Sequence, residues 1–357
     1  MRNSNQNNNE RKKGFFINEF FMKKNPGIET TENDFPAIQP EISEAYSASD
    51  HDNKDSLKLC EISYRPFDER IVYSGRVLVD GPGKEMARNF TRNDNSGIVF
   101  SRLPFSDNCL NVFITKRITD VSFLAANAEA KSFIFPLYDY SGIIKQRDGD
   151  WVSSGILNLN MEIVNKIARG LGLQFVREKE TGNICFVNNN DDLRDEFKQV
   201  FLPADLMDYI YAVLCSPGFV GKYDKPSKNN FPEIHYPQNT EVFWKLVKIG
   251  GTMRQLHLLE CPAVENFITR YPVCGDNLLN SPVYENGNVY INREQYFSNV
   301  PDEVWNFYVG TYQPAQDWLL IRKGKYLSNA EIQKYQKIIV ALSETRRLME
   351  IAGNLLF

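Results

Sequence analysis

The chain has 357 residues, of which 42% are hydrophobic and 13% aromatic, a composition ordinary for a soluble globular protein. It is long enough for roughly two to three domain-sized units. The formal net charge of −4 is unevenly spread, because residues 27–55 hold eight acidic residues against one basic residue and so carry −7, which leaves +3 for the rest. This mildly basic remainder permits a nucleic-acid-binding face but does not demonstrate one.

The cysteines and the apolar runs exclude further classes of protein. The six cysteines are scattered, with no C-x-x-C pair, so we expect reduced thiols rather than a disulfide framework or a zinc site. No apolar run reaches the roughly 18 residues needed to span a membrane, and the Asn-rich N-terminus does not resemble a secretory signal. A cytoplasmic protein is therefore predicted.

Residues 1–56 are predicted to form a polar and acidic N-terminal extension that is partly disordered. Its one apolar patch, Phe15 to Met22, is expected to dock on the body as a short strand or helix. The acidic stretch that follows contains prolines and many small polar residues, as linkers and extended covers do. Residues 57–357 are then expected to form one recognition domain with three parts.

The first part, residues 57–150, is predicted to be β-rich. Its main apolar runs each end in a turn signal and are expected to be strands of one sheet. The turn D-G-P-G-K at 80–84 and one helical turn separate the earlier strands from the later ones. The predicted strands are 71–73, 77–79, 97–102, 111–115, 119–124 and 132–138.

The second part, residues 151–280, has a helical period. Asn158 or Asn160 caps a first helix, and Pro203 starts a second one. A longer helix is predicted from about 239 to 259. Within it, the pair Gly250-Gly251 is expected to allow close packing or a kink.

The third part, residues 281–357, opens with the clearest hairpin signal in the chain. Asn286-Gly287 stands between two apolar runs and predicts a type I′ turn. A strand is expected at 304–310, a helix from Pro314, and a last helix from about 329 to 351. Strands and helices in this order indicate a mixed α+β fold.

No catalytic constellation is visible in the sequence. The three histidines lie far apart and have no Ser or Cys nucleophile beside them. One of them, His257, falls on an apolar helix face, where a core histidine is expected. We therefore predict no catalytic residue, no metal site and no cofactor.

Several stretches, in this order, resemble one family. In the first half they are Y-R-P-F-D-E-R-I-V-Y (64–73), G-I-V-F-S-R (97–102), F-I-T-K-R-I-T-D (113–120) and F-P-L-Y (135–138). In the middle they are D-L-M-D-Y-I-Y-A-V-L-C-S-P-G-F (205–219), F-P-E-I (231–234), F-W-K-L-V-K-I-G (243–250) and H-L-L-E (257–260). At the end they are V-W-N-F-Y-V-G-T-Y-Q-P-A-Q-D-W-L-L-I-R-K-G (304–324) and Y-Q-K-I-I-V-A-L-S-E-T (335–345). The ordered set resembles the C-terminal target-recognition domain of type ISP and related single-chain type II restriction-modification enzymes.

The resemblance implies that the domain reads duplex DNA beside an adenine-N6 methyltransferase. No N-P-P-Y-type tetrad and no glycine-rich cofactor loop precede residue 57, which departs from the whole enzyme. We therefore expect a non-catalytic DNA recognition module that works with a methyltransferase or nuclease partner supplied by a separate chain. The alternative is a remnant or protein-interaction module that keeps the fold and no longer binds DNA.

Candidate DNA contacts come from loops and strand ends. Arg102, Lys116 and Arg117 stand at predicted strand ends and could equally contact DNA or form structural pairs, with Asp120 as a partner for Arg117. By contrast, Arg65 is expected to brace its turn by pairing with Asp68 or Glu69. The other DNA-contact candidates lie in predicted loops: Arg88, Arg92, Asn93, Lys222, Lys225 and Lys228.

Overall fold

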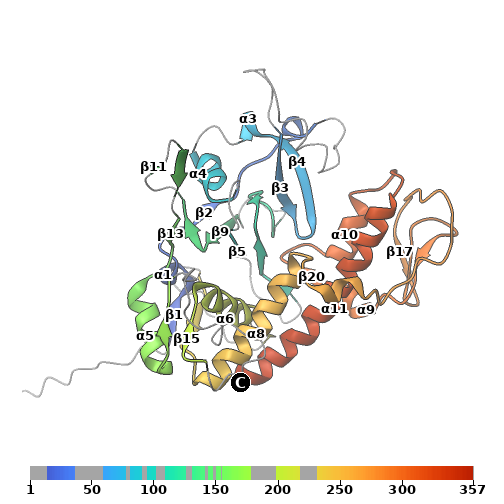
Figure 1. Cartoon of the computed structure of the whole chain (residues 1–357). Coiled ribbons are helices and arrows are strands. Elements are labelled where there is room, and N and C mark those ends of the chain that lie inside the picture. The colour runs from blue at the N-terminus through green and yellow to red at the C-terminus, as the bar shows by residue number, and fades with distance from the viewer. Residues whose placement is uncertain are drawn as a thin grey trace, which may run out of the picture.

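The computed structural model describes residues 14–36, 59–77, 81–90, 95–101, 109–125, 131–140, 144–147, 150–153, 155–177, 198–217 and 231–356. The fold is mixed α+β, as the order of elements predicted. β-strands make up one end of the molecule, helices α5, α6, α8 and α11 make up the other, and a small lobe around β17 lies at one side (Figure 1).

A four-stranded antiparallel sheet lies at the centre of the β-rich end. Its order is β2 (Asn25–Pro26), β9 (Ser132–Pro136), β5 (Gly97–Ser101) and β7 (Val112–Thr115). All residues of β5 and β7 are buried, as expected for strands covered on both faces. Gly97 pairs with Thr115 on one side and with Pro136 on the other, so three strand ends meet at one edge.

The Y-R-P-F-D run belongs to a second sheet. It has the order β4 (Asp68–Tyr73), β3 (Leu59–Arg65) and β8 (Ile118–Thr119). The prediction of a single sheet was therefore wrong, because the chain leaves one sheet after β7 and enters the other at β8. The link between them is Lys116-Arg117, and the strand predicted at 119–124 ends early because Asp120 accepts the Ser122 N–H in a turn.

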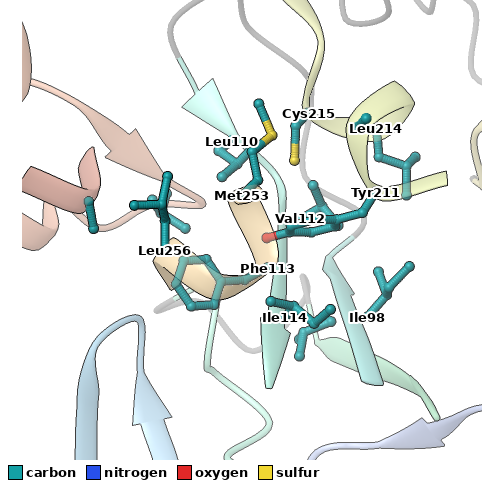
Figure 2. Packing of buried hydrophobic residues seen from close by; sticks show 14 of the residues in the cluster. Ile98, Leu110, Val112, Phe113, Ile114, Tyr211, Leu214, Cys215, Met253 and Leu256 are labelled. Atoms are coloured by element: carbon teal, nitrogen blue, oxygen red, sulfur yellow. The ribbon is translucent and has the colours of Figure 1, made fainter. Parts of the chain in front are cut away.

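Three long helices form a layer beside the four-stranded sheet: the first two contact its strand β7, and the third packs against these two helices. They are α6 (Pro203–Cys215), α8 (Thr240–His257) and α11 (Asn329–Leu356). Eleven of the 13 residues of α6 are buried, so it is the central helix of the layer. Side chains of α6 and α8 pack against the segment from Leu110 to Ile114 (Figure 2).

Local capping signals set where these helices begin. The Asn160 side chain accepts the Glu162 N–H at the start of α5 (Met161–Leu171), which decides between the two predicted caps. In the same way, Asn239 accepts the Val242 N–H at the start of α8. Pro203 begins α6 as predicted, because the first helical turn does not need its missing N–H.

His257 is a core histidine, as predicted. Its ring stacks on Phe113 with centroids 4.5 Å apart, and its two ring nitrogens face the hydroxyl groups of Tyr211 and Thr345. Complete burial lowers the pKa of His257 to about 3. The imidazole is therefore neutral at physiological pH.

The apolar patch near the N-terminus belongs to the body. It forms β1 (Gly14–Phe16) and α1 (Ile17–Phe20), and Phe15, Ile17 and Phe20 are buried. β1 pairs with β16 (Glu233–His235) and β2 joins the central sheet. Residues 14–36 therefore lie within the folded domain rather than in a polar extension, while the rest of the predicted extension lies outside the described residues.

The small lobe is built on the predicted hairpin. β17 (Val283–Glu285) and β18 (Asn288–Tyr290) are joined by Asn286 and Gly287, whose φ angles of 50° and 81° are those a type I′ turn needs. β19 (Tyr296–Phe297) completes a three-stranded sheet.

Two local predictions were wrong. Residues 304–310 form the end of the short helix α9 (Asp302–Trp305) and the two-residue strand β20 (Tyr308–Val309) instead of one strand. The stretch 81–84, predicted as a turn, belongs to helix α4 (Gly81–Phe90), where Pro82 occupies the first turn that tolerates proline. Val77, predicted to begin a strand, ends helix α3 (Ser74–Val77).

The remaining elements are short strands and helix α10. They are β6 (Cys109–Leu110), β10 (Tyr138–Asp139), β11 (Ile144–Arg147), β12 (Asp150–Ser153), β13 (Ile156–Leu157), β14 (Gln174–Phe175), β15 (Val200–Phe201) and α10 (Pro314–Leu320).

No helix among the described residues is long and apolar enough to cross a membrane.

Candidate nucleic-acid interface

Three of the nine predicted DNA-contact residues lie in described parts of the chain. Arg88 is exposed near the end of α4, and Lys116 and Arg117 form the link between the two sheets. The other six lie outside the described residues: Arg92, Asn93, Arg102, Lys222, Lys225 and Lys228.

Arg117 forms an ion pair with Glu61 of β3. Its Nε lies 2.8 Å from Glu61 Oε2, and the Glu61 side chain is buried. Arg117 therefore pairs with Glu61, whereas the sequence predicted Asp120 as its partner. The pair ties the link to the three-stranded sheet.

Asp120 instead holds Arg65. The Arg65 guanidinium donates to Asp120 Oδ1 at 3.2 Å, and its centre lies 3.9 Å from the Tyr64 ring centroid and 5.0 Å from that of Tyr312. The predicted structural role of Arg65 is confirmed, but its predicted partners were wrong. Asp68 binds Arg70 and Arg322 instead, because β3 carries Arg65 toward Asp120 across the sheet.

Lys116 reaches across to the helical layer. Its Nζ donates to both carboxylate oxygens of Glu260, at 2.9 and 3.0 Å, just beyond the end of α8. Both side chains are partly exposed, and ion pairs of this kind contribute little to stability and exchange readily. Lys116 can therefore exchange this partner for a competing anion.

A pocket of about 360 Å³ opens beside Lys116. On one side it is bounded by three adjacent strand ends, at Ser96, Lys116 and Leu137, which the sheet register brings together. On the other side lies the first turn of α6. The pocket therefore sits where the edge of the central sheet meets the helical layer.

Three basic side chains line this pocket: Lys116, Arg177 and Arg254. None of the described lining residues is acidic. Arg177 follows β14 and is exposed. The pocket thus presents a cationic rim to an approaching ligand.

Arg254 is fixed in place by Asp208. Its Nε and Nη2 donate to the two Asp208 carboxylate oxygens at 2.7 and 2.9 Å, a bidentate geometry that orients the planar group. The Asp208 hydrogen bond raises the pKa of Arg254, which stays charged. A guanidinium has five N–H donors, so donors on Nη1 remain for a ligand.

Arg177 and Arg254 were not predicted from the sequence as site residues. Arg254 lies within an otherwise ordinary helix, and Arg177 follows a two-residue strand. Only the packing of α6 and α8 on the sheet brings them to Lys116. Within the described residues, no group of three or more His, Cys, Asp or Glu side chains is placed to hold a metal ion.

Comparison with known protein families decides the family. The sequence model of the Type ISP C-terminal specificity domain matches residues 2–351. The chain belongs to this family. The match starts well before residue 57, in agreement with the packing of residues 14–36 into this specificity domain.

Solved structures share the fold of the specificity domain at low sequence identity. The DNA-bound, ATP-dependent Type ISP restriction-modification enzyme LlaBIII is 15% identical with a TM-score of 0.61, over 92% of this chain and 23% of that one. A DrdV–DNA complex is 13% identical with a TM-score of 0.62, over 92% and 35%. A nuclease-deletion mutant of the Type ISP enzyme LlaGI with a DNA substrate mimic is 14% identical with a TM-score of 0.53, over 84% and 25%.

The specificity domain spans about a quarter to a third of the length of these solved chains. No curated protein matches the sequence.

Proposed function

We propose that this specificity domain recognises a sequence in duplex DNA and has no catalytic activity of its own. The observation that carries the proposal is the family match over residues 2–351. The pocket at the edge of the central sheet supports it, because three basic side chains line it and none of its described lining residues is acidic, which suits the phosphate backbone.

Lys116 and Arg177 are the proposed phosphate contacts within the described chain. Lys116 pairs with Glu260 through partly exposed side chains, and Arg177 is exposed and lines the same pocket. Phosphate contacts of this kind fix the register of a protein on DNA without reading its bases. The other sequence-predicted contacts stay proposals for base or phosphate binding: Arg88, Arg92, Asn93, Arg102, Arg117, Lys222, Lys225 and Lys228.

Catalysis in the proposed system comes from a methyltransferase or nuclease partner. The support is that the chain corresponds to only 23–35% of the enzymes whose fold it shares. The recognition domain would hold the DNA in register while that partner acts on it.

Selection from a random duplex pool tests sequence recognition. The folded chain is mixed with the pool at about 50 mM salt, and bound duplexes are recovered, amplified and sequenced over several rounds. We expect enrichment of one motif of several base pairs, and tighter binding of that motif than of a scrambled duplex. Recovered duplexes without any shared motif would overturn sequence recognition and favour a module that no longer reads DNA.

A further inference from the structure

The pocket beside Lys116 has walls of two chemical kinds. Three of its lining side chains are cationic, and we call these the rim, whereas most of the others are apolar and include one aromatic ring. The apolar side chains come both from the ends of the sheet strands and from the first turn of α6. The apolar and aromatic lining residues are Leu137, Tyr138, Leu202, Pro203, Ala204 and Met207.

The cationic rim has hydrogen-bond donors to offer. Arg254 is oriented by Asp208 and keeps its Nη1 donors, while Lys116 is held by an exposed pair that a phosphate can displace. Arg177, which is exposed, adds a third cation to the pocket lining. Two of these three groups already have a carboxylate partner, so the rim suits a ligand of low charge such as a single phosphodiester.

Size and chemistry together restrict the ligand. A volume of about 360 Å³ lies in the range of small-molecule pockets, which are mostly apolar with a few placed polar groups. A phosphate ion alone would leave the apolar walls in contact with water. A purely apolar ligand would accept no hydrogen bond from the cationic side chains.

We propose that this pocket binds a single nucleotide of a DNA strand, with the base between the apolar walls and the phosphate at the rim. The base packs against Tyr138 and the first turn of α6, as bases pack on aromatic and apolar side chains in other proteins. The phosphate accepts hydrogen bonds from Lys116, Arg177 and Arg254. This inference rests on the proposed function, because the bound DNA supplies the nucleotide.

Ala204 provides a way to fill the pocket without changing a charge. It is exposed on the first turn of α6 and lines the pocket, so Ala204→Trp places a ring in the space of the base. Ala330 is also exposed in the first turn of a helix, α11, and is not part of the pocket lining, so Ala330→Trp is the matched control. Circular dichroism verifies that both variants are folded.

Two fluorescence-labelled duplexes with the same sequence test the pocket, one fully paired and one with a single unpaired nucleotide. We expect the wild type and Ala330→Trp to bind the second duplex about tenfold more tightly. Ala204→Trp should lose this preference, so that the ratio of its affinities for the two duplexes falls to about one. Ala204→Leu, which adds a smaller side chain, should reduce the preference in part.

Free deoxyadenosine 5′-monophosphate gives an independent measurement by calorimetry. We expect it to bind wild type more tightly than deoxyadenosine or inorganic phosphate does, and to bind Ala204→Trp more weakly. Binding of the paired duplex with no preference for the unpaired nucleotide, or a preference that survives Ala204→Trp, overturns the inference and leaves DNA recognition standing. If neither duplex binds, the proposed function fails, and the pocket inference fails with it unless the free nucleotide binds in the predicted pattern.

Discussion

Gly250 of α8 lies directly against the backbone of Asp208 in α6. A Cβ built at position 250 would lie 1.8 Å from the Asp208 carbonyl oxygen, closer than any two such atoms can approach. The two helices therefore touch backbone to backbone at this point. The same contact places the Asp208 carboxylate where it can accept two hydrogen bonds from Arg254, one turn along α8.

Replacing this glycine should destabilise the fold. Gly250→Ala forces α6 and α8 apart, and overpacking of this kind costs about 1–3 kcal/mol. Gly170→Ala is the matched control, because a Cβ at position 170 in α5 meets nothing within 4 Å and alanine favours the helix. Urea denaturation measures both. Equal stability of Gly250→Ala and wild type would contradict the close contact.

Burial of His257 predicts a pH dependence of stability. Its pKa is about 3 in the folded chain against about 6.5 when unfolded, so the unfolded state binds the extra proton between these values. Stability from this group is present above about pH 6.5 and is lost as the pH falls toward 3, by at most about 1.4 kcal/mol per pH unit. Denaturation at a series of pH values measures the slope.

The variant His257→Gln isolates this contribution, because glutamine does not titrate. We expect a less stable protein whose stability falls less steeply with acid than that of the wild type. His235→Gln is the control, since His235 is exposed. Identical slopes of stability against pH in wild type and His257→Gln would refute the lowered pKa of His257.

Asp205 acts in the opposite direction. Burial raises its pKa to about 6, so this residue lowers the stability of the fold as the pH rises from about 4 to 6.

A buried carboxylate joins the β-rich end to the C-terminal helices. Asp68 accepts from Arg70 Nε and Arg322 Nη2, both at 3.0 Å, and Arg322 also binds Glu331 at the start of α11. Asp68→Ala removes the buried carboxylate that both arginines share and should cost about 3 kcal/mol. Exposed Asp302 provides the control, where alanine should change stability by less than about 0.5 kcal/mol.

A double-mutant cycle separates the ion pair from other effects of Asp68→Ala. Adding Arg322→Leu to Asp68→Ala should cost less than the sum of the two single changes, because the pair is already broken. Strict additivity, measured by urea denaturation, would show that Asp68 and Arg322 do not interact.

Elements with strong local signals were predictable from the sequence. The cap of α5, predicted as Asn158 or Asn160, the proline at the start of α6 and the Asn286-Gly287 turn each depend on residues within one turn of chain. Sheet membership was not predictable, since it depends on pairing between distant segments. Ile62 pairs with Ile118 while the neighbouring Thr115 pairs with Gly97, and no local pattern separates these two sheets.

The candidate site shows the same division between features with a local sequence signal and features that depend on distant segments. Lys116 was predicted as a DNA contact from its place at a strand end, which a local pattern can show. Its partner Glu260 stands 144 positions away, and the pocket also needs Arg177 and Arg254 from two other elements. Side chains brought together by three separate segments carry no shared sequence signal, so only the packed structure reveals them.

Removal of a single positive charge that contacts phosphate should weaken DNA binding equally for all sequences. Lys116→Gln and Arg177→Gln should each lower affinity for specific and scrambled duplexes alike, because phosphates carry no sequence information. Arg169→Gln is the matched control, an exposed arginine at the end of α5 whose Nε bonds the Asn165 carbonyl. An unchanged affinity in both pocket variants would exclude these two side chains as contacts.

The salt dependence of duplex-DNA binding tests the central claim most directly. Affinity of the folded wild-type chain is measured by fluorescence anisotropy from about 50 to 200 mM salt. We predict a linear fall of log affinity with log salt, and a slope smaller by about 0.9 in Lys116→Gln and in Arg177→Gln. A folded protein that binds no duplex at about 50 mM salt would contradict the assignment of this chain as a DNA recognition domain.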